Sequence, residues 1–169
     1  MKKTRRLLAL LLAMVMMLAL TVTAGAEEVT TTAAKNEITV IYTNDVHSHI
    51  DKTLSYATVS AMKQDYQKAG KQVLLVDAGD HIQGTAYGGM DEGKTIVQLM
   101  NAAGYDIATL GNHEFDYGMA RALATVEEAK FPYVSCNFYH EKNGVAGDPV
   151  LESYKVFDMN GTKIAFVGI

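Results

Sequence analysis

The chain has very little cysteine: Cys136 is the only one in 169 residues. One thiol cannot form an internal disulfide, so no such staple is expected. The surrounding residues, YVSCNF, are typical of a strand, and we interpret Cys136 as a small buried apolar residue and not as a nucleophile. Basic residues form no cluster outside the extreme N-terminus, and the net charge of -4 gives no reason to expect nucleic-acid binding.

The sequence also lacks an apolar run long enough to cross a bilayer. The run from Leu7 to Leu20 has about 14 residues, whereas a spanning helix needs roughly 20. Basic residues precede this run and Ala24-Gly25-Ala26 follows it, which is the pattern of a secretory signal peptide. We therefore predict a cleaved signal peptide at 1–26, in preference to a transmembrane anchor, and a polar linker at 27–37. The mature protein is expected to be secreted or extracytoplasmic, in the periplasm or at the cell surface, without an integral membrane segment.

Residues 38–169 alternate between two kinds of pattern. Apolar runs at 38–43, 73–78, 105–110 and 133–137 predict four strands that are buried on both faces. A segment from about Leu54 to Ala69, and two stripes with apolar residues at i, i+3, i+4 and i+7, predict the helices between them. The alternation predicts an α/β domain with a largely parallel sheet. The two stripes are Ile96, Leu99, Met100 and Ala103, closed by Gly104, and Met119, Ala122, Leu123 and Val126.

A different pattern ends the sequence. Two strand-like runs in YKVFDMNGTKIAFVGI flank Asn160-Gly161, which is a strong signal for a β-hairpin. The second run is apolar up to Ile169, and we expect the chain to be the N-terminal part of a longer protein.

Polar side chains gather directly after each of the first three predicted strands. A plain turn does not need so many of these residue types. Because the carboxyl ends of parallel strands meet at one edge of a sheet, we expect the three groups to converge on a shared site. The groups are Asp45, His47 and His49, then Asp77 and Asp80, then Asn112, His113, Glu114 and Asp116.

Four residues of these groups are predicted to be metal ligands. Asp45 and His47 are two residues apart, a spacing that directs both side chains to the same side of an extended segment. A carboxylate beside an imidazole suits Zn²⁺, Mn²⁺ or Fe better than Ca²⁺, which prefers oxygen ligands. Asp80 has two oxygens that can bridge two cations, and Asn112 offers an amide oxygen. Two divalent cations about 3.5–4 Å apart can clamp the attacking and leaving oxygens of a phosphoryl displacement.

The third group predicts the acid–base part of the same site. His113 follows Asn112 directly, so its imidazole is expected at the mouth of the same pocket. There it can stabilise charge on phosphoryl oxygens or protonate a leaving group. Asp116, three residues further on, can orient this ring and keep it cationic. Each motif alone also fits ordinary turn chemistry, but the presence of all three at successive strand ends favours a metal site.

Three stretches resemble the motifs of a known family, in order and in spacing. They are TNDVHSH, VDAGDHIQGT and TLGNHEFDYG, and they resemble the calcineurin-like metallophosphoesterases, in particular the secreted 5′-nucleotidase / 2′,3′-cyclic phosphodiesterase family. The resemblance covers residues 38–169 and implies the N-terminal part of a metallophosphoesterase β-sandwich flanked by helices. It implies that Asp45 and His47 bind one divalent metal ion, that Asp80 bridges two, and that Asn112 binds the second.

The resemblance also implies a reaction. His113 and Asp116 would form the catalytic pair, and Asn112 and His113 would contact the phosphate of the substrate. The implied activity is hydrolysis of a nucleoside monophosphate, a small-molecule substrate, with a metal-bound hydroxide as nucleophile and Zn, Mn or a similar metal in both positions.

The sequence departs from the family pattern in several places. Tyr42 stands where the family often has histidine, His81 stands where an apolar or small residue is common, and His49 is not at a ligand position of the family. We interpret both histidines as supporting or surface residues and not as ligands. The later histidine motifs that complete the metal sites of the family, and its base-binding domain, do not occur in these residues. The isolated chain is therefore expected to supply about half of a dinuclear site, and to be inactive or nearly so and poorly folded when alone.

Two alternatives fit the same residues. Relatives of this family hydrolyse UDP-sugars, cyclic nucleotides or sulfur esters, because the shared motifs handle the reacting group and not the rest of the substrate. A non-catalytic secreted binding protein, or an inactive remnant, would keep the scaffold without turnover. The residues whose loss would indicate such a protein are all present, which favours an enzyme. They are Asp45, Asp80, Asn112 and His113.

Overall fold

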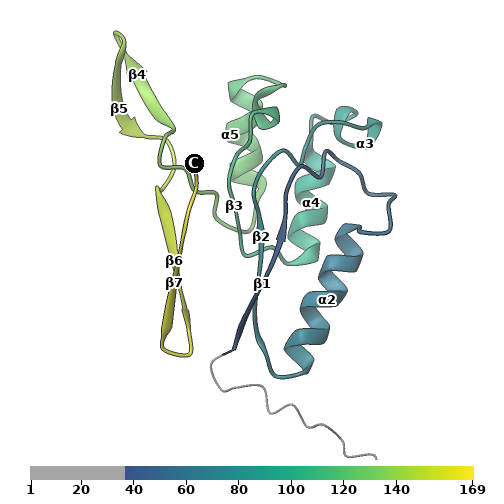
Figure 1. Ribbon diagram of the computed structural model, residues 1–169. Helices are drawn as coiled ribbons and strands as arrows, with labels where there is room; N and C mark the ends of the chain where they lie inside the picture. Colours follow the sequence, from purple (N-terminus) through teal and green to yellow (C-terminus); the bar gives the residue numbers. More distant parts are fainter. Residues whose placement is uncertain (1–36) are drawn as a thin grey trace, which may run out of the picture. The chain divides into compact units, whose positions relative to one another are not determined.

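The computed structural model describes residues 37–169 (Figure 1), so the predicted signal peptide, and the predicted linker except its last residue, lie outside the described part. Among residues 37–169, no helix is both long enough and apolar enough to cross a membrane. The first elements are β1 (Ile38–Thr43), α2 (Tyr56–Lys68), β2 (Gln72–Asp77), α3 (Ala86–Gly89), α4 (Lys94–Ala103) and β3 (Ile107–Ala108). They are followed by the 3₁₀ turn η1 (His113–Phe115), α5 (Met119–Glu128), β4 (Tyr139–Lys142), β5 (Val145–Pro149), β6 (Tyr154–Met159) and β7 (Thr162–Val167).

The strands β1, β2 and β3 form a parallel sheet in that order, as predicted. β1 pairs with β2 over its whole length, with Thr43 opposite Asp77 at the carboxyl end. β3 pairs with β2 through Ile107 and Ala108 alone, so it is shorter than the predicted strand at 105–110. Because the ladder stops at Asp77 and Ala108, the residues that follow all three strands form loops at one edge of the sheet.

The predicted strand at 133–137 is wrong as a regular strand. Tyr133 makes one parallel bridge to Ala108, and Val134 makes one parallel bridge to Glu152. The backbone N–H of Cys136 donates to the carbonyl of Gly168 at 2.8 Å. Cys136 is only half-buried, so its interpretation as a buried core residue is not correct.

The helices α2 and α4 lie side by side, as Figure 1 shows. Each connects two neighbouring parallel strands that advance in the same direction, and right-handed connections place both helices on one face of the sheet. α2 begins after Ser55, whose hydroxyl accepts the N–H of Thr58. α4 ends at Gly104, whose left-handed φ of 80° terminates the helix as predicted.

The apolar stripes of the helices form much of the core. In α4, Ile96, Met100 and Ala103 are buried as predicted. In α5, Ala122 is buried, whereas Met119, the first residue of the helix, is 51% exposed. The core cluster consists of Tyr56, Val59, Leu75, Ile82, Ile96, Val97, Met100, Ala103, Tyr105, Ala108, Phe131 and Tyr133.

Burial on both faces is confirmed for β2 and is wrong for β1. Val73–Leu75 are all buried, because β2 is the central strand. β1 is an edge strand whose Ile41 packs against the core, whereas Val40 and Tyr42, on the opposite face, are 42% and 72% exposed. An apolar run therefore predicted the strand correctly but did not predict its place in the sheet.

Two hairpins follow the α/β part of the chain. β6 and β7 pair on either side of Asn160 and Gly161, whose φ angles of 52° and 90° are those of the predicted two-residue turn. β4 and β5 form a second, exposed hairpin, which the sequence analysis did not predict. The sequence has the same Asn-Gly signal at Asn143-Gly144, and both residues have the positive φ angles of such a turn. The α/β class is confirmed, and residues 37–169 contain one parallel sheet and these two hairpins.

A partly buried ion pair ties α2 to the end of α4 and to the sheet. The ammonium group of Lys63 donates to the carbonyl of Gly104 at 2.6 Å and to Asp106 Oδ2 at 2.7 Å. The same carboxylate oxygen accepts the backbone N–H of Leu75 in β2 at 2.7 Å. Three elements are thus joined by one cation and one carboxylate.

Replacing Lys63 by methionine is expected to lower the free energy of unfolding by about 1.5–3 kcal/mol, the usual value of a hydrogen bond to a charged group. Urea unfolding of the intact protein, followed by circular dichroism, measures this change. Lys68→Met is the control, because Lys68 pairs with Asp65 at the exposed surface of the same helix. We expect it to change stability by less than about 0.5 kcal/mol. Equal losses in the two variants would contradict the prediction.

Candidate active site

The three loops at the carboxyl edge of the sheet are joined by hydrogen bonds that their backbone N–H groups donate. After β1, the N–H groups of Asp45 and His47 donate to the carbonyls of Gly79 and Asp80, at 3.1 and 2.9 Å. After β3, the N–H of His113 donates to Asp80 Oδ1 at 2.8 Å. The loop after β2 therefore lies between the other two and contacts both. The predicted convergence of the three polar groups is present in the structure.

Three side chains, one from each loop, form a cluster that can hold a metal ion. They are His47, Asp80 and His113, and one potential ligand atom from each lies within 4.8 Å of the others. The rings of the two histidines meet edge to face, with centroids 4.9 Å apart. All three residues are half-buried, so their polar atoms are held in place and still reach solvent. The cluster contains three of the six residues that the sequence predicted for the site.

Both histidines have one ring nitrogen engaged by the protein. Nδ1 of His47 donates to the carbonyl of Gln83 at 3.0 Å, and Nδ1 of His113 donates to Asp116 Oδ2 at 2.7 Å. Nε2 of each ring is thereby left for another partner, which is the usual arrangement for histidines that bind metals or act on substrates. The hydrogen bond to Asp116 raises the pKa of His113 above its ordinary value. The contact predicted between His113 and Asp116 is present.

Asp45 lies beside His47, although not for the reason given by the sequence. Its Oδ1 is 3.6 Å from His47 Nε2. The backbone between them is not extended, since Asp45, His47 and Ser48 have φ angles of 53°, 48° and 52°. The backbone of Asp80 is also in the left-handed conformation, with φ of 58°. Such conformations cost about 1–3 kcal/mol each and persist where the surrounding structure enforces them, typically at functional sites.

Asn112 and Asp77 differ in exposure, since the first is exposed and the second is buried. Asn112 precedes the turn η1 and is exposed, and among the described residues its side-chain amide forms no hydrogen bond with the cluster. Asp77 is buried at the end of β2, where it accepts hydrogen bonds from Thr43, the N–H of Gly79 and His81. Its carboxylate is used inside the protein, so it does not belong to the group of candidate ligands.

The loop that carries His47 is held by residues of the loop after β2. Ser48 is fully buried, and its hydroxyl accepts the N–H of Thr85 at 2.8 Å while Thr85 Oγ1 donates to the carbonyl of Ser48 at 2.9 Å. Gly84, with φ of 139°, passes so close that a Cβ there would lie 2.6 Å from the carbonyl oxygen of His47. These contacts, together with the bond from His47 to Gln83, place the imidazole. The sequence analysis did not find them, because polar turn residues show no partner before the chain folds.

Two further polar residues lie buried beneath the cluster. His81, interpreted from sequence as a supporting or surface residue, is fully buried between Asp77 and the hydroxyl of Tyr133, with both contacts at 2.8 Å. Burial by itself lowers the pKa of His81, but the hydrogen bond to Asp77 and the charges of Asp77 and Glu114 outweigh it and raise this pKa. Glu114 is also fully buried, and sequence analysis gave it no role of its own.

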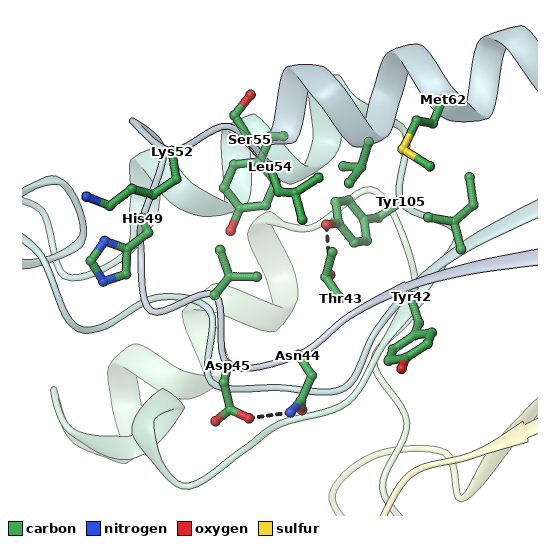
Figure 2. A pocket seen from close by; sticks show the side chains of 14 residues that line it. Tyr42, Thr43, Asn44, Asp45, His49, Lys52, Leu54, Ser55, Met62 and Tyr105 are labelled. Atoms are coloured by element: carbon green, nitrogen blue, oxygen red, sulfur yellow. Dashed lines mark hydrogen bonds between the residues drawn. The ribbon is translucent and has the colours of Figure 1, made fainter.

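A groove of about 710 Å³ runs along β1 and the beginning of α2 (Figure 2). Its walls include apolar side chains such as Leu54 and Met62. The hydroxyl of Tyr105, another lining residue, forms a hydrogen bond with the hydroxyl of Thr43 at 2.8 Å. His49, predicted to be a supporting or surface residue, is exposed and lies near Lys52 in Figure 2. The lining of the groove includes Asp45 and Val46, which precede His47 in the chain, but it does not include His47, Asp80 or His113.

The donor set fits a divalent metal ion. Imidazole and carboxylate groups, here those of His47, Asp45 and Asp80, are ligands for Zn²⁺, Mn²⁺ or Fe, whereas Ca²⁺ prefers oxygen ligands alone. Asp45 and Asp80 concentrate negative charge at this edge, and in residues 37–169 neither forms an ion pair with a lysine or an arginine. A cation is therefore the partner that this arrangement of side chains favours.

Several known proteins are similar in sequence to this chain. Among curated relatives, a snake venom 5′-nucleotidase from Gloydius brevicauda is 32% identical over 152 residues, which cover 80% of this chain and 26% of that protein. A 5′-nucleotidase from Homo sapiens is 39% identical over 116 residues, which cover 60% of this chain and 20% of that protein. The chain thus spans about a quarter, or less, of the length of these relatives.

Solved structures show the same fold. The NAD nucleotidase of Haemophilus influenzae superimposes with a TM-score of 0.67 and 30% identity, covering 77% of this chain and 26% of that chain. A 5′-nucleotidase precursor from Thermus thermophilus gives a TM-score of 0.66 with 28% identity, covering 77% of this chain and 28% of that chain. The family model described as calcineurin-like phosphoesterase matches residues 38–167. This match includes the parallel sheet and all three loops that carry the cluster, and the chain therefore belongs to the calcineurin-like phosphoesterase family.

Proposed function

We propose that the protein hydrolyses phosphate esters of nucleosides, with a nucleoside 5′-monophosphate as the main substrate. The observation that carries this proposal is the cluster of His47, Asp80 and His113, with Asp116 behind His113. The relatives named as 5′-nucleotidases support the nucleotide as substrate. Activity on 2′,3′-cyclic nucleotides or UDP-sugars is compatible with the same cluster, because these residues face the reacting group and not the rest of the substrate.

Members of this family use divalent metal ions, and two such ions are part of the proposal. Asp45 and His47 would hold the first, Asp80 would be shared by both, and Asn112 would hold the second. When bound, the cations supply a water molecule of lowered pKa and neutralise charge on the phosphoryl oxygens. The protein's own contribution is to hold its ligands in place, and the bond from His47 Nδ1 to Gln83 does so for one imidazole.

His113 and Asp116 would act on the phosphate of the substrate. Asp116 accepts a hydrogen bond from Nδ1 of His113. This bond fixes the ring and leaves Nε2 directed away from Asp116. Because the same contact raises the pKa of His113, the imidazole holds its proton more firmly than a free histidine does. A protonated imidazole can donate a hydrogen bond to a phosphoryl oxygen and can transfer its proton to the leaving group.

We further propose that the reaction takes place outside the cytoplasm. The predicted signal peptide at 1–26 supports this location, and the venom enzyme among the relatives is consistent with it.

Phosphate release from AMP by the intact protein tests the proposed function. We expect release to stop after treatment with EDTA and to return when Mn²⁺ or Zn²⁺ is added, because the cluster needs a cation. Asp80→Asn should not recover with either metal, since it loses the charge that would be shared by two cations. 2′,3′-cyclic AMP and UDP-glucose, assayed in parallel, compare the possible substrates.

Two results would contradict the proposal. Hydrolysis that continues at the full rate in EDTA would exclude a role for exchangeable divalent ions. Binding of AMP without phosphate release under any metal would indicate a binding protein on this scaffold.

A further inference from the structure

Glu114 is an unusual carboxylate, because it is fully buried and its partners are backbone groups of two loops. Oε2 accepts the N–H of Asp80 at 2.8 Å and that of Gly111 at 2.6 Å. Oε1 accepts the N–H of His81 at 2.9 Å and that of Ile82 at 3.3 Å. Three of these donors belong to the loop after β2 and one belongs to the loop after β3.

These N–H groups lie beyond the ends of the strands and cannot be paired by the sheet. The ladder stops at Asp77 in β2 and at Ala108 in β3. A buried N–H without an acceptor is costly, and so is a buried carboxylate without donors. Glu114 satisfies both requirements at once, and both of its oxygens join the loop after β3, to which it belongs, to the loop after β2.

The contact is reciprocal. Glu114, from the loop after β3, accepts the N–H of Asp80, while Asp80 Oδ1 accepts the N–H of His113, from the loop that carries Glu114. Gly111 lies inside this double contact, and a Cβ at its position would be only 2.2 Å from Asp80 Oδ1. The two loops are therefore held at a distance that allows no side chain between them.

The nearest side-chain nitrogen does not replace the backbone donors. Nδ1 of His81 is 3.5 Å from Glu114 Oε1 and is already engaged by Asp77 at 2.8 Å. The four N–H groups are therefore the main partners of the Glu114 carboxylate.

We infer that Glu114 is a positioning residue that sets the place of Asp80 relative to His113 and Asn112. It acts through the backbone of both loops and touches neither metal nor substrate. This inference rests on the proposed function, in which Asp80 is a metal ligand and His113 acts on the phosphate. Loss of the Glu114 contacts would change the distance between Asp80 and His113, although both residues would still be present.

Glu114→Gln tests the inference, because glutamine has nearly the same shape but offers one acceptor oxygen in place of two. Its amide nitrogen would face two N–H donors and could accept from neither. In the metal-free protein, we expect faster hydrogen exchange of the amides of Asp80, His81 and Gly111, with unchanged exchange of Val73–Leu75 in β2. Binding of Mn²⁺, measured by calorimetry, is expected to weaken about 10–100-fold, the usual effect of losing a residue that orients ligands.

Glu141→Gln is the matched control. Glu141 also accepts a backbone N–H, from Gly144 at 2.8 Å, but it lies in the exposed β4–β5 hairpin. Its replacement should change neither the exchange of the loop amides nor the affinity for Mn²⁺. Glu114→Asp is a second test should the glutamine variant fold poorly, since its carboxylate keeps the charge but is one methylene too short to reach the N–H groups of the loop after β2.

The outcomes separate the inference from the proposed function. Wild-type exchange and Mn²⁺ affinity in Glu114→Gln, or in a folded Glu114→Asp, would overturn the positioning role. Faster exchange throughout Val73–Leu75 would also overturn it, because it would show a general loss of stability. If the wild-type protein bound no Mn²⁺, the metal site would fail, whereas the exchange of the loop amides would still decide whether Glu114 holds the loops together.

Discussion

Replacing His113 by alanine is expected to lower kcat for phosphate release about 10²–10⁴-fold, the usual contribution of a positioned general acid or base. The affinity for Mn²⁺ is expected to change less than about tenfold, far less than loss of a direct metal ligand would cause. The combination of a large loss of rate and nearly intact metal binding is the result that distinguishes a group acting on the phosphate from a metal ligand.

Two features of the structure favour this role for His113 over metal binding. Asp116 binds Nδ1 of the ring at 2.7 Å and raises the pKa of His113, so the ring keeps its proton more firmly. An Nε2 that donates a hydrogen bond to the phosphate cannot at the same time coordinate a metal ion. Asp80 and His47 lie within ligand distance of each other in the same cluster, and with Asp45 beside them they can hold a cation without the His113 ring.

His140→Ala is the control for this experiment, since His140 is an exposed residue of β4, and it should leave both kcat and metal affinity unchanged. The measurements are steady-state kinetics on AMP and calorimetric titration with Mn²⁺, both on the intact protein. A loss of Mn²⁺ binding in His113→Ala as large as the loss of rate would identify His113 as a ligand and contradict the proposed division of roles.

Gly111→Ala is the second substitution for which we expect a large effect, a fall in kcat/KM of about 10²-fold. Its Cβ would lie 2.2 Å from Asp80 Oδ1 and 2.8 Å from the backbone nitrogen of Asp80, so Asp80 has to move. A displacement of about 1 Å in a catalytic group can cost this much in rate. Binding of Mn²⁺ should weaken as well, because Asp80 is the proposed shared ligand.

Gly89→Ala is a matched control for Gly111→Ala. Neither glycine has a positive φ, so alanine strains the backbone at neither position, and the two sites differ in the space around the Cβ. At Gly89 the nearest heavy atom is the hydroxyl of Tyr117 at 3.8 Å, which is an ordinary contact. Kinetics and Mn²⁺ titration of both variants decide the question. Equal activity in the two would show that the loop after β3 shifts without disturbing Asp80.

The elements of the fold were largely predictable because their signals are local. Helix periodicity and the glycine at 104 predicted α4, and Asn160-Gly161 predicted the turn between β6 and β7. Errors arose where neighbours distant in sequence decide the outcome. Tyr133 and Val134 form bridges to two different partners, and β1 is an edge strand whose Tyr42 is exposed on the face opposite to Ile41.

The candidate site shows the same division. The sequence by itself placed polar residues after three strands, and parallel strands end at one edge, so the meeting of His47, Asp80 and His113 followed from order along the chain. Only the tertiary structure decided which carboxylates face solvent and which lie inside. Asp77 and Asp80 are three residues apart, yet the first is buried against His81 and the second joins the cluster.

The backbone at the site and the residues that hold it were also decided by tertiary structure alone. The left-handed conformations of Asp45 and Asp80, and the four hydrogen bonds to Glu114, depend on groups that are mostly more than thirty residues apart. Sequence patterns report where apolar burial and turns are favoured, because these are properties of neighbouring residues. The partner of a buried polar group is fixed by which loops the packed core brings together, and that is known only once the chain has folded.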